Sequence, residues 1–212
     1  MTRGGARIPG TRALLLILGV GLATRVAASP IGDAVALFKQ KKYAEARALL
    51  EPLANGTPPD ASACYYLGMT LEQAGKKAAL DPARTWLKKA ADLAPENEVY
   101  LAEYAGVCLL LADRDSSLTL AIEGRNAMTR AIAQNPSDLD AREGLMTFYA
   151  RAPWPLGDAD LAFAQAGEIA ARDPKRWRAA YRTVGEIFLR GGRAERAQSA
   201  FKAAQNLAGN AP

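Results

Sequence analysis

Apolar residues recur at helical spacing through most of the chain, from Ser29 onward. The apolar stretches come in pairs, and Gly, Asp or Pro residues separate them. The sequence has no alternating apolar and polar stretch of useful length. Three of the apolar stretches close in a similar way, with KKAADLA before Pro95, TRAIAQN before Pro136 and GEIAARD before Pro174. This pattern predicts an all-α protein built from helical hairpins.

The hairpins repeat at a nearly constant interval. Prolines at positions 58, 95, 136 and 174 lie 37, 41 and 38 residues apart. A period in this range indicates a solenoid, in which each hairpin covers its apolar face by stacking on the next one. We therefore expect about five stacked hairpins, with units at approximately 29–60, 61–97, 98–138, 139–177 and 178–212.

The residues inside these units resemble the tetratricopeptide (TPR) repeat. Its 34-residue unit has a large residue, Leu-Gly and an aromatic residue on the first helix, then Ala, an aromatic residue or Leu, and Ala on the second, and it closes with Pro. The last unit matches best, through Tyr181, Val184, Gly185, Phe188, Ala197, Phe201 and Ala204. The third unit is the weakest, because Gly124 stands where Ala is usual. The resemblance covers nearly all of residues 29–212 and implies a TPR-like α-solenoid.

Three units are longer than the 34-residue repeat. The extra residues fall around 76–80, 112–117 and 153–160, inside the hairpins, so we expect them to project from one edge of the stack. Length drift in a tolerant loop accounts for them more simply than a binding lip does. The loop APWPLGD, which begins at Ala152, is similar to a loop of some TPR proteins. It lacks one Gly of the Gly pair of that loop, so no function follows from it.

Residues 1–28 have the pattern of a signal peptide. Three arginines precede the apolar stretch Ala13–Ala23, and small residues stand at Val26 and Ala28 before a cleavage site. The stretch is short for a membrane span, which needs about 20 residues, although an uncleaved anchor is the alternative. Cleavage would leave Ser29-Pro30, a favoured start for a helix. The chain is thus predicted to be periplasmic or secreted, with no membrane span after cleavage, and its Ala- and Arg-rich composition points to a bacterium.

The net charge of +5 is concentrated in this predicted leader. Residues 1–28 hold four arginines and no acidic residue, so residues 29–212 carry 23 basic and 22 acidic side chains. A nucleic-acid-binding surface needs a clustered cationic face. The balanced remainder has no basic run, so we predict no nucleic-acid partner.

Residues with catalytic or metal-binding chemistry are few. The chain has no histidine, which excludes Ser-His-Asp and Cys-His nucleophiles and the HExxH zinc site. Its tight carboxylate pairs in predicted loops, Asp113 with Asp115 and Asp158 with Asp160, lack the pattern of a calcium loop. Both pairs precede a predicted helix, where Asp caps free backbone N–H groups. We predict no catalytic residue, cofactor or metal.

The two cysteines allow two interpretations, because an exported protein can form disulfides. Cys64 and Cys108 fall on the first helices of adjacent units, offset along the helix axis by about 10 Å. A disulfide needs Cα atoms within about 7 Å of each other. Two buried free thiols are therefore favoured over a disulfide.

The resemblance also implies a binding surface, because the first helices of TPR proteins line a concave groove that contacts a partner peptide. The first three units contribute apolar or aromatic residues at the matching positions: Ile31, Val35, Phe38, Tyr65, Met69, Val99, Leu109 and Leu110. The last two contribute polar and charged residues: Asp140, Glu143, Thr147, Arg151, Arg182, Glu186 and Arg190. Such a strip suits a helix or an extended segment with a few apolar anchors. An error of one residue in register would instead place some of these side chains in the core.

The last helix is a second candidate contact. Solenoids usually end in a polar capping element, but Phe201, Ala204 and Leu207 give this helix an apolar face that only a short tail follows. We therefore consider self-association through this helix, with Phe201 at the edge of the contact.

These features predict a periplasmic protein–protein interaction module with a scaffold or assembly role. One alternative is a structural subunit of an envelope complex. Another is a small carboxylate-based enzyme, which a repeat stack supports poorly because it rarely encloses a dry pocket.

Overall fold

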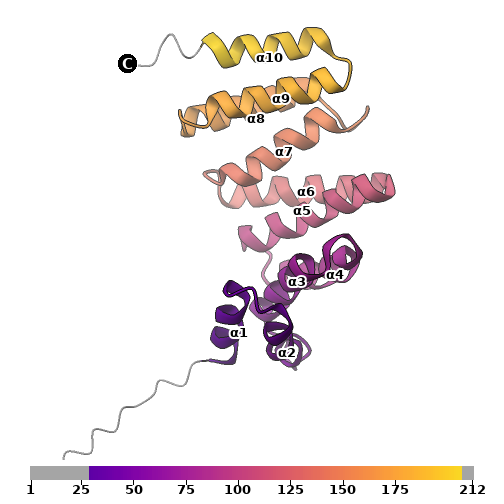
Figure 1. The fold of residues 1–212 in the computed structure, drawn as a ribbon, viewed down its shortest axis with the longest axis vertical. Coiled ribbons are helices and arrows are strands. Elements are labelled where there is room, and N and C mark those ends of the chain that lie inside the picture. The colour runs from indigo at the N-terminus through magenta and orange to yellow at the C-terminus, as the bar shows by residue number, and fades with distance from the viewer. Residues whose placement is uncertain (1–28, 207–212) are drawn as a thin grey trace, which may run out of the picture.

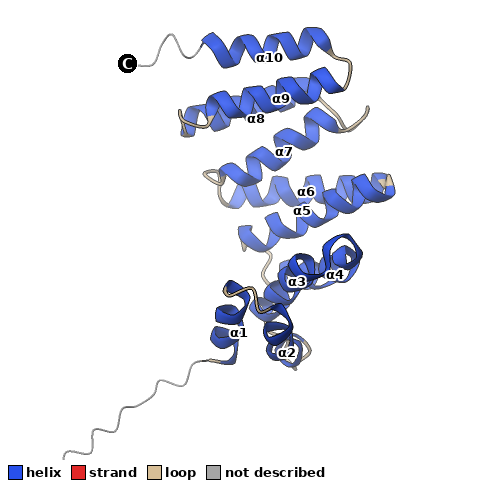
Figure 2. Ribbon diagram, in the orientation of Figure 1, coloured by secondary structure: helices blue, strands red, loops and turns tan. Residues whose placement is uncertain are grey.

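The computed structural model describes residues 29–206, which form ten α-helices and one short 3₁₀ helix. This part of the chain contains no strand, as Figure 2 shows, so the all-α prediction is confirmed. None of its helices combines the length and the apolar character that a membrane span requires. The predicted signal peptide at 1–28 and Leu207 lie outside the described residues.

The helices pair into five hairpins that follow one another in chain order along the long axis of the molecule (Figure 1). Their bounds are α1 Pro30–Lys39, α2 Tyr43–Ala54, α3 Ala61–Gly75, α4 Leu80–Leu93, α5 Glu98–Asp115, α6 Leu118–Gln134, α7 Leu139–Arg151, α8 Ala159–Arg172, α9 Trp177–Arg190 and α10 Ala194–Asn206. The second helix of each of the first four hairpins also packs against the first helix of the next one. The result is a solenoid.

Buried apolar side chains form three clusters, and neighbouring hairpins share each of them. The first cluster joins α1 to α4, the second joins α4 to α7, and the third joins α7 to α10. Because α4 and α7 each contribute to two clusters, no hairpin among the described helices has a core of its own. Stability is therefore a property of the stack.

Residues at several helix ends act as the sequence predicts. Ser29 caps α1 by accepting a hydrogen bond from the backbone N–H of Gly32 at 3.2 Å, and Pro30 takes the first helical position. Asp158 caps α8 by accepting from two backbone N–H groups at 2.8 and 3.0 Å. Gly192 has a φ of 71°, a left-handed conformation that glycine adopts without strain, and it turns the chain from α9 into α10.

Glycines let the two helices of a hairpin approach closely. A methyl group on Gly185 would lie 2.6 Å from the ring of Phe201, and one on Gly68 would lie 2.7 Å from Leu87. Gly124 has the same role where α6 crosses α5, with 2.8 Å to the nearest side chain. These distances are well below van der Waals contact, so a larger residue would push the helices apart.

A tight polar contact joins α4, α5 and α6. Arg84 Nη2 donates to Glu123 Oε2 at 2.5 Å, and the Tyr104 hydroxyl donates to Glu123 Oε1. Burial acts to raise the pKa of the Glu123 carboxyl, but the hydrogen bonds from Tyr104 and Arg84 outweigh it and hold that pKa below its ordinary value. The carboxylate is therefore charged at neutral pH, and it ties the second hairpin to the third.

The prediction that the insertions form projecting loops is wrong for two of the three. Residues 112–115 extend α5, and only Ser116 and Ser117 separate α5 from α6, because extra turns of helix keep backbone groups hydrogen-bonded. Residues 76–79 form the 3₁₀ helix η1. The third insertion is an irregular turn between α7 and α8, where Trp154 is 89% exposed.

The capping role predicted for Asp113 and Asp115 is also wrong. Both residues lie in the last turn of α5, and Ser117 caps α6 by accepting from a backbone N–H. The two carboxylates form ion pairs instead, Asp115 with Arg114 at 2.6 Å and Asp113 with Arg151 at 3.4 Å.

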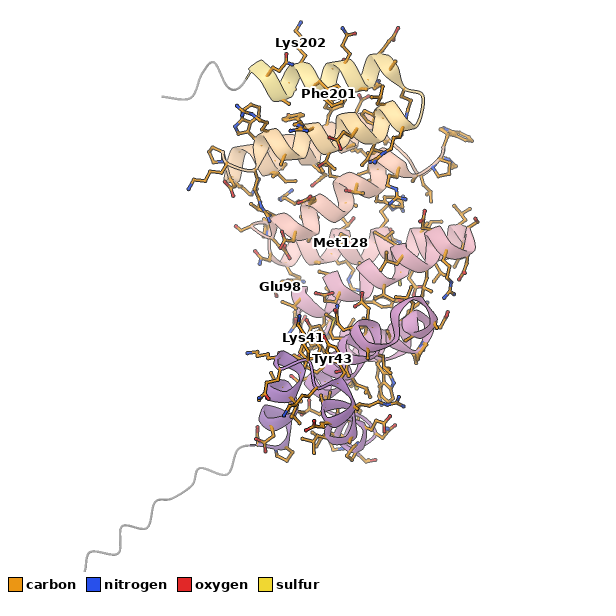
Figure 3. The ribbon with its side chains drawn as sticks, viewed as in Figure 1. Lys41, Tyr43, Glu98, Met128, Phe201 and Lys202 are labelled. Carbon is orange, nitrogen blue, oxygen red and sulfur yellow. The ribbon has the colours of Figure 1, made fainter. Side chains whose placement is uncertain are left out.

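The last helix does not present the predicted apolar face. Phe201 points toward α9, where its ring covers Gly185, while Lys202 points away from the stack (Figure 3). The exposed residues of α10 are mainly polar: Glu195, Arg196, Gln198, Ser199, Lys202 and Gln205. Self-association through Phe201 thus loses its basis, since α10 presents the polar outer face of a capping helix.

Both cysteines are buried and free, as predicted. Burial raises the pKa of each thiol above its ordinary value, so both stay protonated at neutral pH. They act as small apolar side chains of the core.

The close approach at Gly185 can be tested by substitution. Gly185→Ala places a methyl group 2.6 Å from the Phe201 ring, so we expect it to lower the free energy of unfolding by about 1–3 kcal/mol in urea titration. Gly106→Ala is the matched control, because Gly106 lies inside α5 with open space around it. That control is expected to be neutral or to stabilise by up to about 1 kcal/mol. Equal effects of the two substitutions would contradict the close-packing role of Gly185.

Candidate partner-binding surface

The first helices of successive hairpins, α1, α3, α5, α7 and α9, lie beside one another, and side chains make the contact between α3 and α5. We call the sides of these helices that do not pack against second helices the first-helix surface. Aromatic rings connect its N-terminal part, because Phe38 of α1 meets Tyr66 of α3 at 5.6 Å between ring centroids. Farther along, Tyr65 of α3 stacks on Tyr100 of α5 at 4.7 Å.

The tyrosine stack fixes the position of α3 relative to α5. The Tyr65 and Tyr100 rings are tilted by only 23°, and the Tyr100 hydroxyl is 2.9 Å from Ser62 Oγ. Burial is the main cause that raises the pKa of Tyr65, so its hydroxyl stays protonated at any physiological pH. Two half-buried rings thus form a rigid, neutral platform at the seam between two repeats.

Exposed apolar side chains continue the surface on α5 and α9. Val99 is 44% exposed and Leu110 is 51% exposed, and their spacing of eleven residues places them on one side of α5. Leu189 of α9 is 57% exposed. The first helix α7 lies between α5 and α9, so these side chains offer separate anchoring points for a partner along the surface.

The predicted residues nearer the N-terminus are more buried than these. Ile31 and Phe38 pack partly against the first core cluster, and Met69 packs partly against the second. Val35 is also half-buried. These side chains form the floor of the surface and leave part of each side chain in contact with solvent.

The assignment of Leu109 to this surface is wrong. Its side chain covers Gly124 of α6, at the crossing point of the third hairpin. Glycine at position 124 leaves a space on α6 that Leu109 fills, so Leu109 belongs to the interior of the hairpin.

Glu103 adds a carboxylate beside the tyrosine platform. Burial is the main cause that raises the pKa of Glu103, and the nearby carboxylates of Glu72 and Asp138 raise it further. None of the described side chains forms an ion pair with it. Burial likewise raises the pKa of Glu72, which lies on α3 in the same helical stripe as Tyr65 and Met69. This end of the surface is therefore aromatic and acidic.

The other end is basic. Arg151 and Arg190, both predicted, line a hollow of about 550 Å³ between α7 and α9, together with Thr147. Glu143, Arg182 and Glu186 are exposed nearby, and Arg182 pairs with Glu186 at 3.5 Å along α9. The structure thus brings Arg151 and Arg190 together, while Glu143, Arg182 and Glu186 lie outside the hollow.

Several residues of this surface do not follow from the apolar pattern alone. Glu72 is seven residues after Tyr65, two helical turns farther on the same face, so its position could have been read from the spacing. Tyr100 and Glu103 face the preceding first helix, which only the stacking of the repeats reveals. Arg193 and Thr183 join the hollow because of the turn at Gly191-Gly192 and the packing of α9 on α7.

The described residues contain no group of three or more Cys, Asp or Glu side chains arranged to hold a metal ion. The arrangement offers apolar, aromatic and charged contact groups on a continuous surface of neighbouring helices.

Solved structures share this fold, although no protein-family model and no curated protein matches the sequence. YrrB, described as a TPR protein with an unusual peptide-binding site, superposes with a TM-score of 0.66 at 19% identity, over 85% of this chain and 86% of YrrB. The fold is that of TPR proteins.

Two further solved structures have the same fold. MamA superposes with a TM-score of 0.66 at 19% identity, over 82% of this chain and 87% of MamA. The protein TTC0263 of Thermus thermophilus is described as a thermophilic TPR protein. It superposes with a TM-score of 0.57 at 20% identity, over 85% of this chain and 91% of the TTC0263 chain. The predicted TPR-like solenoid is thus confirmed as a fold.

The environment of Glu103 predicts a pH-dependent gain in stability on neutralising it. Its pKa is higher in the folded protein than in the unfolded chain, so its charge destabilises the fold above the folded pKa, and the penalty disappears as the pH falls. Glu103→Gln should therefore raise the free energy of unfolding near neutral pH. The gain should shrink as the pH falls through the raised pKa of the folded state, and it should be lost below about pH 4.5, the ordinary value for this carboxyl.

Urea titration at both pH values measures this difference. Glu96→Gln, at an exposed position in the turn before α5, is the control and is expected to change stability little at either pH. A loss of stability in Glu103→Gln near neutral pH would contradict the unfavourable burial of the Glu103 charge.

Proposed function

We propose that this protein is an exported binding module that holds a segment of a partner protein across its first-helix surface. The observation that carries the proposal is the row of solvent-accessible apolar and aromatic side chains on neighbouring first helices, above all Val99 and Leu110 beside the Tyr65–Tyr100 stack. Second helices also carry exposed leucines, such as Leu93 and Leu161, but Val99 and Leu110 differ from these in sharing one helix face next to a rigid aromatic stack, and this combination favours a contact surface.

The chemistry of the surface favours a peptide-like partner over a small molecule. The hollow between α7 and α9 is open to solvent, and so is a second one between α9 and α10 that Arg178, Arg182 and Phe201 line. Small-molecule sites instead enclose most of the ligand. A long, shallow surface with a few anchoring points suits a helix or an extended segment. YrrB, which has the same fold, is described as carrying a peptide-binding site, and this supports the proposal by analogy of fold.

Export is supported by the sequence of residues 1–28, with its arginines, short apolar stretch and small residues before Ser29. The start of α1 agrees with cleavage there, since Ser29 caps the first helix. We infer a periplasmic or secreted protein that assembles or holds other envelope or secreted proteins.

Photo-crosslinking tests the binding surface. A photoreactive phenylalanine analogue at Val99 or Leu110 should form crosslinked products with one discrete protein when the full chain is expressed in its native host. The controls are Leu93 and Leu161 on second helices, which are 43% and 42% exposed and so match Val99 at 44%. Equal crosslinking from the second-helix positions would contradict the proposal, because contact would then follow exposure alone.

Cleavage of the leader is tested separately. The protein isolated from the envelope or medium of its host should have the intact mass of a chain that begins at Ser29. A full-length protein found in the cytoplasm would contradict export, whereas a full-length protein found in the membrane would indicate an uncleaved anchor.

A further inference from the structure

The hollow between α7 and α9 has the donor groups of an anion site. Its volume is about 550 Å³, and α7, α9 and the turn after α9 contribute its lining residues: Thr147, Arg151, Thr183, Ile187, Arg190, Gly191 and Arg193. No residue in this lining is acidic. Every polar side chain there can donate a hydrogen bond, and the arginine side chains have no hydrogen-bond acceptor.

The three arginines differ in how firmly the protein already holds them. Arg193 is fixed, because its guanidinium donates to the Ala150 carbonyl and lies over the Phe188 ring at 4.5 Å from the centroid. Arg151 has one loose partner, Asp113, at 3.4 Å, and both side chains are largely exposed. Arg190 forms no ion pair with any described residue. Two guanidinium groups can therefore turn toward an incoming anion, next to a third that is preorganised.

The position of the hollow indicates where such an anion would come from. Arg151 of α7 and Arg190 of α9 line a hollow between two neighbouring first helices, so the hollow lies along the first-helix surface. Ile187 forms part of the lining and is nearly buried, which gives the hollow an apolar side next to its charged one. A side chain with a short aliphatic stem and a charged end fits these two sides.

We propose that this hollow binds a carboxylate side chain, Asp or Glu, of a partner segment that lies on the first-helix surface. The proposal rests on the proposed function, because the segment presents the carboxylate. Planar guanidinium groups match a carboxylate with two parallel hydrogen bonds, and the Thr147 and Thr183 hydroxyls can supply further donors. A nucleic acid is disfavoured, since it needs an extended cationic surface and the hollow is one compact site.

Three tripeptides and one ion serve as probes for NMR titration of the ¹⁵N-labelled protein, residues 29–212. Acetyl-Leu-Glu-Leu-amide carries the proposed group, and acetyl-Leu-Gln-Leu-amide lacks the charge. Acetyl-Leu-Gln-Leu with a free C-terminal carboxylate tests a chain terminus, and inorganic phosphate tests a free anion. We expect the Glu peptide to shift the backbone amides of Thr183 and Gly191 and to bind at least tenfold more tightly than the Gln amide.

Substitutions connect this binding to the hollow. The double variant Arg151→Gln/Arg190→Gln should weaken binding of the Glu peptide at least tenfold. Arg178→Gln is the matched control, because Arg178 lies on the same helix twelve residues before Arg190 and outside the hollow. It should leave binding unchanged. Retained amide spectra outside the hollow show that each variant is folded.

Each other result overturns the assignment in a defined way. Equal affinities for the Glu and Gln amides would show that the hollow does not recognise the charge of the carboxylate. Stronger binding of the free terminus or of phosphate reassigns the hollow to a chain end or to an inorganic anion. If Val99 and Leu110 form crosslinks while the Glu peptide does not bind, the result supports the proposed function and contradicts the carboxylate site. If the Glu peptide binds and crosslinking fails, the site exists without the proposed docking surface.

Discussion

The close crossing of two helices, seen at a glycine in three of the five hairpins, is the constraint on which the stacking of the repeats depends. At Gly68, Gly124 and Gly185 the backbone of one helix receives the side chain of its partner, and no Cβ can be accommodated there without displacing that side chain. The separation of the two helices follows from this contact, and with it the angle at which the next hairpin can stack. Because every core cluster spans neighbouring hairpins, an error at one crossing is passed to the next repeat. The first-helix surface depends on the same crossings, since these place α3, α5, α7 and α9 side by side.

The polar contacts between hairpins also follow the repeat. Arg176 pairs with Asp140 and Arg196 pairs with Asp160, each at 2.8 Å and each over 36 residues, about one repeat length. Exposed pairs of this kind add little stability singly. The half-buried contacts between repeats, the Tyr65–Tyr100 stack and the Arg84–Glu123 pair, are more specific because they need one relative placement of the helices. They oppose sliding of one repeat along the next, so a site made of residues from several first helices keeps its geometry.

Sequence reasoning predicts the parts of this structure that are local. Helix caps such as Ser29 and Asp158, the turn at Gly191-Gly192 and the small residues at the crossings follow from short-range rules of backbone hydrogen bonding and volume. It fails where two segments compete for the same side chain. Leu109 has the spacing of a surface residue, but its side chain fills the space above Gly124. The extra residues at 112–115, which the sequence predicts as part of a loop, extend α5 instead. Tyr100 and Glu103 are recognisable only once α5 lies beside α3.

The candidate surface contains features that the fold does not need. A repeat stack gains nothing from Leu110 or Leu189 in water, and the buried charge of Glu103 opposes folding, as its raised pKa indicates. Features that weaken a fold without structural return are typical of functional sites. Their order along the stack adds direction, because the aromatic and acidic groups lie on α3 and α5 while the arginines of the hollow lie on α7, on α9 and in the turn after α9. A partner segment held across this surface would meet opposite charges at its two ends. Reversing that segment would place like charges together, so the surface would select one orientation by repulsion as much as by attraction.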